Sequence, residues 1–209
     1  MKKKLILGVT AGGSSRLLDG QAKYFKQLGY EVYLISQNHF KEPIFCQKEG
    51  IEHLPVQIVS DINPLKDVIS LIQIIKHFRA IQPDIVNVGT PKMGLLGMMA
   101  AKFLGVKTRI YTCRGLRFET EKGLKRWILE QMEKYTVSLA HHVIYVSPSL
   151  KNAALKYGVA QPTKAIVIGE GSSNGVDTSA FKSEAIDAEK RKALISKYQL
   201  ENKTVIGFV

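Results

Sequence analysis

The sequence predicts an α/β domain with a doubly wound parallel sheet, and two patterns lead to this prediction. Short runs of apolar, often β-branched residues recur along the chain, nearly continuous rather than alternating with polar residues. This pattern is typical of strands that are buried on both faces. Segments with helical periodicity separate the runs, and such strand–helix alternation favours a parallel sheet with helices packed on it.

Seven of these runs are expected to form strands. They lie at residues 5–9, 31–36, 84–88, 108–112, 142–146, 165–168 and 204–209. Parallel strands joined by helices give a Rossmann-like arrangement, in which ligands bind at the carboxyl ends of the strands. We therefore expect functional residues in the loops that follow these runs.

The helices are predicted from apolar spacing and from residues that begin or end a helix. The first is expected over 14–28, with Gly29 as its stop. The clearest apolar stripe lies within 63–81, where Pro64 suits a first helical turn. That stripe consists of Leu65, Val68, Ile69, Ile72, Ile75 and Phe78. Further helices are expected at 93–105, 124–139, 148–158 and 189–199.

Composition places the chain among soluble globular proteins. Of its 209 residues, 45% are hydrophobic and 23% charged, as is usual for that class. The two cysteines, Cys46 and Cys113, are expected to be free thiols in a reducing cytoplasm. The apolar run after Lys2–Lys4 is too short for a signal peptide, and no run reaches the ~20 apolar residues of a membrane span.

Unlike the rest of the composition, the net charge is unusual, because 30 basic residues and 18 acidic ones give a net charge of +12. Such a charge favours polyanionic partners: nucleic acid, an anionic lipid surface or a phosphorylated substrate. Nucleic acid is not expected, because the sequence shows no recognition helix and no aromatic stacking platform. The basic residues beside Leu124 and Trp127 suggest a membrane-facing helix start, with an ordinary solvated helix face as the alternative. They are Lys122, Lys125 and Arg126.

A glycine-rich loop, Gly12-Gly13-Ser14, follows the first predicted strand and opens the first helix. Glycines there let a phosphate or hydroxyl group approach the backbone amides, although a tight strand-to-helix turn is the alternative. A Walker A loop is excluded because no lysine precedes Ser14. A dinucleotide fingerprint is excluded because the second strand ends in Ser36-Gln37, without a carboxylate for a ribose.

Two later loops hold further candidates. Thr90 and Lys92 follow the third predicted strand, where Lys92 is either a ligand for an anionic group or a solvated lysine. Arg114, Gly115 and Glu119 follow the fourth. Arginine binds phosphate or carboxylate in a bidentate manner, and ordinary surface charge is the alternative for this loop. No metal site is expected, since His141 and His142 point to opposite faces of a strand and no zinc-ligand spacing occurs.

Several stretches together resemble glycosyltransferase family 4, a group of bacterial sugar transferases of the GT-B type. The stretches are 6–15 (ILGVTAGGSS), 90–120 (with GLRFE), 146–154 (VSPSLKNAA) and 167–181 (VIGEGSSNGVDTSAF). The likeness is greatest to enzymes that assemble capsular polysaccharide or O-antigen. It implies retaining transfer of a sugar from a nucleoside-diphosphate sugar to a saccharide or lipid-linked acceptor in cell-surface polysaccharide synthesis.

The resemblance also implies a domain organisation. GT-B enzymes have two Rossmann-like domains that face each other across a cleft. Residues 1–181 match the N-terminal, acceptor-side domain, and 182–209 match a linker helix and the first strand of a second domain. The second domain holds most of the donor, so we expect the isolated chain to be inactive. No cofactor and no metal are expected, and the enzyme is expected in the cytoplasm, peripherally at the inner face of the membrane.

The resemblance implies that Gly12, Gly13, Arg114 and Glu119 line the cleft. Together with the other candidates at strand ends, the expected cleft residues are Gly12, Gly13, Ser14, Thr90, Lys92, Arg114, Gly115 and Glu119. An interdomain hinge is expected at Asn174, Gly175, Val176 and Asp177. Catalytic residues stay unassigned, because many relatives carry a histidine where this chain has Arg114-Gly115 and another near Gly89.

Two functions of other classes remain as alternatives. The net charge motivates a non-catalytic Rossmann-like module that binds a polyanion. A nicotinamide-dependent sugar epimerase or reductase is weakened by the missing fingerprint and carboxylate.

Overall fold

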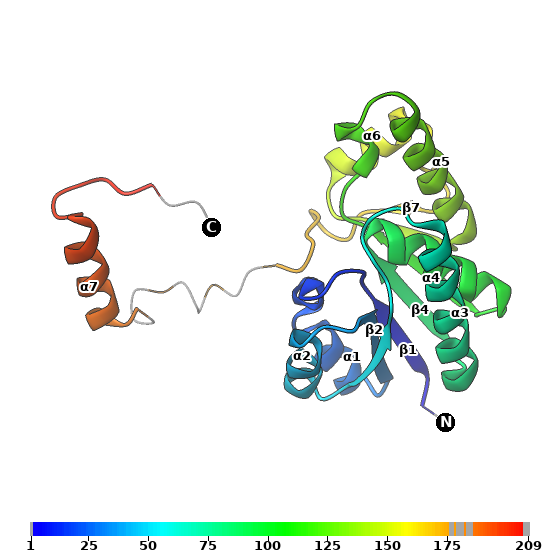
Figure 1. The fold of residues 1–209 in the computed structure, drawn as a ribbon, viewed down its shortest axis with the longest axis horizontal. Coiled ribbons are helices and arrows are strands. Elements are labelled where there is room, and N and C mark those ends of the chain that lie inside the picture. The colour runs from blue at the N-terminus through cyan, green and yellow to red at the C-terminus, as the bar shows by residue number, and fades with distance from the viewer. Residues whose placement is uncertain (1, 176–177, 179–181, 183–185, 207–209) are drawn as a thin grey trace. The chain divides into compact units, whose positions relative to one another are not determined.

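The computed structural model describes residues 2–175, 178, 182 and 186–206, and it divides the chain into two units. The first unit is Met1–Asn174 and the second is Gly175–Val209 (Figure 1). In the second unit, the described residues include one helix, α7 (Ala188–Tyr198), whose start is capped by the Asp187 side chain.

The first unit is built on a seven-stranded parallel sheet with the order β3-β2-β1-β4-β5-β6-β7. The strands are β1 (Lys4–Gly8), β2 (Glu31–Gln37), β3 (Glu52–Val56), β4 (Ile85–Gly89), β5 (Thr108–Cys113), β6 (His142–Tyr145) and β7 (Ala165–Ile166). The strand order reverses between β1 and β4, where Leu5 pairs with Val32 on one side and Ile85 on the other. Such a switch point opens a crevice at the carboxyl ends of the strands. The predicted fold class, a Rossmann-like parallel α/β sheet, is confirmed.

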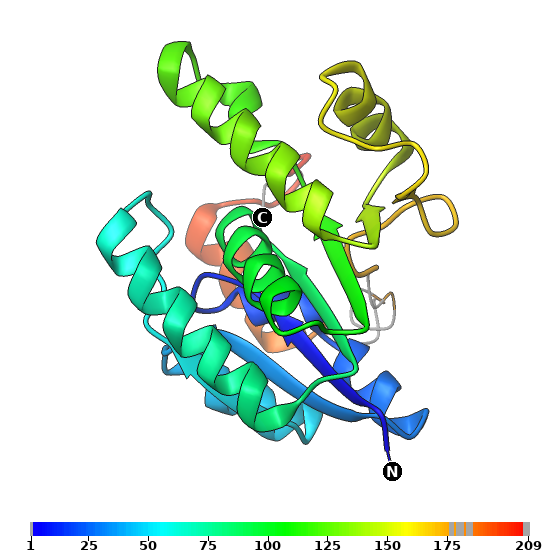
Figure 2. The ribbon, with the colours of Figure 1, turned by 90° about the vertical axis from the view of Figure 1, so that its right-hand side faces the viewer.

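Helices cover the sheet on both faces. The α-helices are α1 (Gln21–Gln27), α2 (Lys41–Glu49), α3 (Pro64–Ile81), α4 (Pro91–Phe103), α5 (Gly123–Leu139) and α6 (Pro148–Lys156). Two short 3₁₀ helices, η1 (Ser14–Leu18) and η2 (Arg117–Thr120), lie before α1 and α5. Figure 2 shows α3, α4 and α5 side by side, and α4 packs against both of its neighbours.

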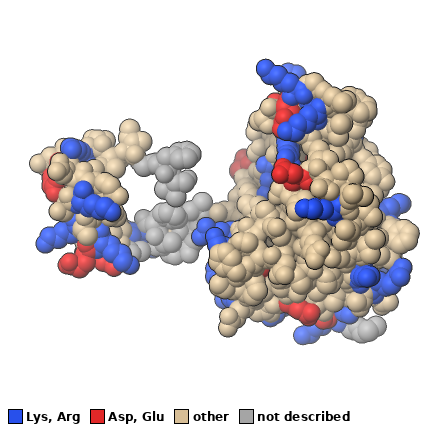
Figure 3. Space-filling model, in the orientation of Figure 1, with Lys and Arg blue, Asp and Glu red and all other residues tan. Residues whose placement is uncertain are grey.

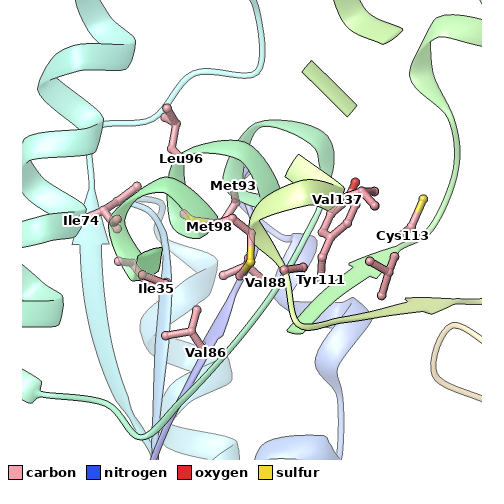
Figure 4. Packing of buried hydrophobic residues seen from close by; sticks show 14 of the residues in the cluster. Ile35, Ile74, Val86, Val88, Met93, Leu96, Met98, Tyr111, Cys113 and Val137 are labelled. Atoms are coloured by element: carbon pink, nitrogen blue, oxygen red, sulfur yellow. The ribbon is translucent and has the colours of Figure 1, made fainter. Parts of the chain in front are cut away.

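The buried residues form one cluster on each face of the sheet. Side chains alternate along a strand, so Leu5 and Leu7 join the cluster under α1 and α2, whereas Ile6 joins the larger cluster under α3, α4 and α5. In the larger cluster, Met93 and Met98 of α4 lie over Val86 and Val88 of β4 (Figure 4). Helix α4 is therefore central to the core, as its nearly all-apolar sequence predicted.

The sequence prediction missed one strand and one helix. The residues of β3 alternate between exposed and buried and include Pro55, because β3 is an edge strand that needs fewer hydrogen bonds. Helix α2 carries two buried glutamates, Glu42 and Glu49, where an apolar stripe would be expected. Both elements therefore lack the apolar signal by which the others were found.

Three predicted elements differ from the structure. The helix expected over 14–28 is broken at Asp19-Gly20 into η1 and α1, because Gly20 has a left-handed backbone (φ 79°). The strand expected over 165–168 ends at Ile166. The strand expected over 204–209 is not formed at 204–206, and 207–209 lie outside the described residues.

Of the stripe predicted on α3, only Phe78 is buried, and the buried face of the helix runs through Ser70, Ile74 and Phe78 instead. Phe78 is 1% exposed, whereas Leu65 is 82% exposed and Ile69 is 49% exposed. Helix α3 packs against α4 and β3 near the edge of the sheet, so its first turns extend beyond the core. An apolar face without a described partner is left at the start of this helix.

Candidate functional site

The candidate site lies at the switch point of the sheet, where the loops after β1 and β4 are joined by two threonines. The hydroxyl groups of Thr10 and Thr90 are 2.6 Å apart, and the Thr10 amide donates to Thr90 Oγ1 at 3.0 Å. Thr10 Oγ1 also accepts the amide of Met93 in the first turn of α4. These bonds fix the two loops that form the rim of the crevice.

Thr90 has a strained backbone. Its φ of 67° lies in a region that β-branched residues rarely adopt. Strain of this kind costs of order 1–3 kcal/mol and persists only where the surroundings hold the residue in place. The bonds to Thr10 provide that support, and such strain is common at ligand sites.

Arg114, directly after β5, is held among segments that are distant in the sequence. Its Nε donates to Ser173 Oγ at 3.1 Å, and its Nη2 donates to the Leu17 carbonyl at 3.4 Å. Its Nη1 lies against Gly89, where a Cβ atom would be only 1.9 Å away, and is buried without a hydrogen-bond partner among the described residues. Burial lowers the pKa of Arg114 from its ordinary value, although an arginine stays charged at neutral pH.

A pocket of about 440 Å³ lies beside Arg114. It is lined by Leu17, Thr90, Pro91, Tyr111, Arg114, Gly115, Leu116, Arg117, Glu119 and Thr120. Four predicted site residues are thus brought together: Thr90, Arg114, Gly115 and Glu119. The mixture of apolar walls with a few charged groups suits an organic ligand with an anionic part.

The outer side of this pocket is formed by η2 and the glycine before it. A Cβ atom at Gly115 would meet no atom within 4 Å, so this position faces open space. Glu119 is exposed. Arg117 donates to the Ser60 carbonyl at 3.0 Å and lies 3.8 Å from Asp61, which links η2 to the loop before α3.

The amides of the predicted glycine loop are occupied by protein side chains. The Gly12 amide donates to Gln37 Oε1 at 3.0 Å, and the Gly13 amide donates to Glu42 Oε1 at 2.6 Å. The Ser14 amide donates to the Ala11 carbonyl at 3.0 Å. The glycine loop leads into η1, and Leu17 of η1 lines the pocket. The amides of the loop are not free to donate hydrogen bonds to a ligand in the pocket.

Lys92 is placed apart from the other candidates. Its side chain is 4% exposed, and its Nζ bonds Asp67 Oδ1 at 2.7 Å and the Asp61 carbonyl. It joins α4 to α3 and lines a much smaller cavity of about 20 Å³ that also contacts Glu133. A lysine that is already paired and buried is poorly suited to bind a ligand in an open cleft.

The predicted hinge is described only in part. Asn174 donates to the Asp19 carbonyl at 2.9 Å and accepts from Gln21 Nε2 at 3.2 Å, so it is tied to the break between η1 and α1. Gly175 has φ 74°. Val176 and Asp177 lie outside the described residues.

A buried polar cluster lies beneath the pocket. Tyr111 donates to Glu133 Oε2 at 3.3 Å, and the Cys113 thiol donates to Glu133 Oε1 at 3.6 Å. Burial raises the pKa of Glu133 to about 7, and the two hydrogen bonds only partly oppose this shift. Burial also raises the pKa of Cys113, as expected of a structural thiol rather than a nucleophile.

In the part of the chain that the structure describes, no three His, Cys, Asp or Glu side chains are grouped closely enough to hold a metal ion. None of the described helices is long and apolar enough to span a membrane.

Some residues of the site were not predicted from the sequence. Gln37 and Glu42 hold the glycine loop, and Leu17 and Ser173 hold Arg114. Gln37 could have been suspected as a site residue from the sequence, because it directly follows a predicted strand at the carboxyl edge of the sheet. The other three are ordinary residues whose role depends on contacts between distant segments.

Fold and site together define a Rossmann-like half-domain with a ligand pocket at its switch point. The family model for Glycosyltransferase Family 4 matches residues 11–180. The chain belongs to glycosyltransferase family 4, as the resemblance predicted.

Two curated relatives and one solved structure show how much of such a protein the chain spans. It is 36% identical over 207 residues to the capsular polysaccharide biosynthesis glycosyltransferase CapM of Staphylococcus aureus, covering 99% of this chain and 53% of the relative. It is 30% identical over 162 residues to an Escherichia coli UDP-Gal:α-D-GlcNAc-diphosphoundecaprenol α-1,3-galactosyltransferase, covering 72% of this chain and 41% of that one. A Rickettsia africae glycosyltransferase structure superimposes with a TM-score of 0.68 at 23% identity, over 96% of this chain and 50% of that one. The chain thus spans about half the length of the proteins it matches.

Proposed function

We propose that this chain is the acceptor-side half of a GT-B sugar transferase for cell-surface polysaccharide synthesis. One observation carries the proposal: at the wall of a switch-point pocket, Arg114 has a buried Nη1 without a hydrogen-bond partner among the described residues and no acidic side chain bonded to it. An arginine at a pocket wall that no described acidic side chain neutralises can bind an anionic group of a ligand through its guanidinium.

The substrate class is proposed from the relatives. One relative acts in capsular polysaccharide biosynthesis, and the other has a name that specifies a UDP-sugar donor and a lipid-linked diphosphate acceptor. A saccharide or lipid-linked acceptor suits the pocket, because apolar residues line much of it and Arg114 offers a site for a phosphate. The nucleotide-sugar donor would be held mainly by a second domain.

The chemistry proposed for the pocket is electrostatic. In a sugar transfer, negative charge develops on the departing diphosphate, and a preorganised cation lowers the energy of that state. Arg114 is preorganised by its bonds to Ser173 and Leu17, so it would lose little side-chain freedom on binding. Retention of configuration is carried over from the family, and catalytic residues stay unassigned.

We also propose that the enzyme works at the cytoplasmic face of a membrane. The exposed apolar residues Leu65 on α3, and Leu124 and Trp127 on α5, lie at the starts of two helices that begin at the same edge of the sheet as the pocket. The exposed lysines Lys66 and Lys122 lie beside them. Apolar and basic residues together favour an anionic lipid surface.

The alternative, a non-catalytic module for a polyanion, has less support. Figure 3 shows Lys and Arg side chains in several separate groups on the visible face of the first unit, mixed with acidic ones. A polyanion-binding module would favour a continuous basic patch or stripe. The comparisons with known proteins lend it no support.

The test measures the affinity of this chain for a ligand by isothermal titration calorimetry. The ligand is a water-soluble sugar diphosphate with a short prenyl chain. We expect Arg114→Ala to weaken binding about tenfold or more, as loss of a charged hydrogen bond should. Arg79→Ala, an exposed arginine near the opposite edge of the sheet, is the matched control. Equal affinity of Arg114→Ala and the wild type would refute the assignment of the pocket.

Activity gives a second test. We expect no sugar transfer by the 209-residue chain alone, and measurable turnover by it would contradict the half-enzyme proposal. In a fusion with the second half of a family relative, Arg114→Ala and Gly13→Val should both lower turnover. Valine at Gly13 would be strained, because φ there is 83°.

A further inference from the structure

Helix α2 carries two glutamates that are buried yet have no ion-pair partner among the described residues. Glu42 is 0% exposed and Glu49 is 5% exposed. They are seven residues apart, which is two turns of an α-helix, so they lie on the same face. Buried carboxylates are costly unless they are hydrogen-bonded, so the groups that bind these two are informative.

Both glutamates bind backbone amides at the start of a helical segment. Glu49 accepts the amides of Gly20 at 3.2 Å and Lys23 at 2.9 Å, where α1 begins. Glu42 accepts the amide of Gly13, where η1 begins. Free amides at a helix start carry partial positive charge, and a carboxylate satisfies them as an external anion would.

Glu42 therefore occupies the place where a substrate phosphate was expected to bind. Its Oε1 lies 2.6 Å from the Gly13 nitrogen, and its Oε2 is buried without a hydrogen-bond partner among the described residues. The neighbouring Gly12 amide is bound by Gln37, and a Cβ atom at Gly12 would overlap the His39 ring at 2.2 Å. A phosphate at this loop could not bind the Gly12 and Gly13 amides, because both already donate hydrogen bonds, and the nearby Glu42 carboxylate would repel it.

Lys41 is the cation that lies against this loop. Its Cδ is 3.7 Å from the Cβ position at Gly13, but its Nζ lies 5.7 Å from the centre of the Phe40 ring and has no described hydrogen bond to the loop. Arg114, in contrast, has a buried free donor and no described carboxylate bonded to it. The two sides of the switch point thus differ in the charge they accept.

We propose that Glu42 is a positioning residue that holds the glycine loop in its folded form and keeps anions away from it. The phosphate groups of a bound substrate are then received at Arg114, and the part of the substrate next to Gly12 and Gly13 is uncharged, as a sugar ring is. The assignment of the uncharged part rests on the proposed function. The role of Glu42 in the loop does not.

The experiment titrates inorganic pyrophosphate into the 15N-labelled chain and follows the Gly12 and Gly13 amides and Arg114 Nε–H. In the wild type, we expect the glycine amides to stay unmoved while the Arg114 signal shifts with saturation. Glu42→Ala should free the Gly13 amide, which then shifts with saturation and exchanges its hydrogen about tenfold faster or more. Glu42→Gln keeps an acceptor, so it should behave as the wild type does in the titration.

Glu49→Ala is the matched control, because it removes a buried carboxylate of the same helix and should leave Gly13 unmoved. A saturable shift of Gly13 in the wild type would overturn the proposal, as would unchanged hydrogen exchange in Glu42→Ala. If Glu42→Ala does not fold, the Glu42→Gln variant provides the test. Loss of the charged acceptor should move the chemical shift of the Gly13 amide proton upfield, and an unchanged chemical shift would refute the role of Glu42.

The outcomes separate this proposal from the proposed function. If both Gly13 and Arg114 shift in the wild type, the role of Glu42 is wrong and the anion site at Arg114 stands. If neither shifts, the role of Glu42 stands and the anion site at Arg114 is wrong.

Discussion

At the residue scale, the site depends on three side chains in unusual states: strained Thr90, Arg114 with a free buried donor, and the buried acid Glu133. Each lies at or beneath the pocket. Each is held by residues from other loops or helices, and features of this kind cluster at functional sites.

Thr90→Val tests the threonine link between the loops after β1 and β4. Valine keeps the branched shape and the backbone strain but loses the bonds to Thr10. We expect the free energy of unfolding to fall by about 1–3 kcal/mol, because the Thr10 amide and hydroxyl lose a partner. Urea denaturation measures this, with Thr163→Val at an exposed position as control. Equal losses in the two variants would contradict the prediction.

Glu133 should make stability depend on pH. Its pKa is raised to about 7 in the folded chain, so between its ordinary value and pH 7 the folded state binds more protons than the unfolded state. Stability should therefore fall as pH rises through this window, by about 3 kcal/mol in all. Glu133→Gln removes the titrating group and should flatten the dependence.

The measurement compares unfolding free energies at pH 5 and pH 8 for the wild type, Glu133→Gln and Glu130→Gln. Glu130 is one turn earlier on α5 and pairs with Lys134 on the helix surface. If Glu133→Gln retains the full pH dependence of the wild type, another group is responsible.

At the element scale, α4 connects the core to the site. It packs against both α3 and α5, and its first turn is bonded to Thr10. Gly94 permits the close packing of α4 on strand β5, because a Cβ atom there would lie 2.5 Å from the Tyr111 ring. Helix α4 is joined to α3 by the buried pair of Lys92 and Asp67.

The Lys92–Asp67 pair gives a prediction for this junction. Asp67→Ala leaves a buried ammonium without its carboxylate and should cost about 3 kcal/mol of stability. The double variant Asp67→Leu/Lys92→Met should cost less, since it removes both charges. Urea denaturation of both variants provides the comparison, and Glu130→Gln, which breaks the partly exposed pair with Lys134, should cost under about 1 kcal/mol. A double variant that is less stable than Asp67→Ala would show that this pair is net stabilising.

At the scale of the whole chain, the pocket and the exposed apolar residues share one edge of the sheet in the first unit. Helices that follow parallel strands begin at the carboxyl edge, so the starts of α3 and α5 lie at the same edge of the sheet as the pocket. This arrangement would present a lipid-linked substrate to Arg114 from a membrane surface.

Vesicle binding tests that arrangement. We expect Leu124→Glu/Trp127→Glu to reduce sedimentation with phosphatidylglycerol-containing vesicles about tenfold, because two exposed apolar side chains are replaced by acids. Phe103→Glu is the control, as Phe103 is 70% exposed but lies at the far end of α4. Equal losses in both variants would point to net charge alone.

Much of the fold was predictable, because strands buried on both faces must be apolar and helices with one buried face must be periodic. Edge strand β3 and helix α2 escaped prediction since neither needs a continuous apolar signal. The pocket was predicted in part, as loops at strand ends meet at one edge of a parallel sheet. The burial of Lys92 and its ion pair with Asp67 were not predicted, because Asp67 lies 25 residues away in the sequence and only the packing of α3 against α4 brings the two together.

The sequence by itself determined the parallel α/β architecture, the family and the strand ends where the site lies, because these depend on local patterns and motif order. Only the tertiary structure decided which side chains meet there. It paired Lys92 with Asp67, left Arg114 with a free donor, and occupied the Gly13 amide with Glu42. Hydrogen bonds between distant segments depend on three-dimensional distance, which residue order along a chain does not specify.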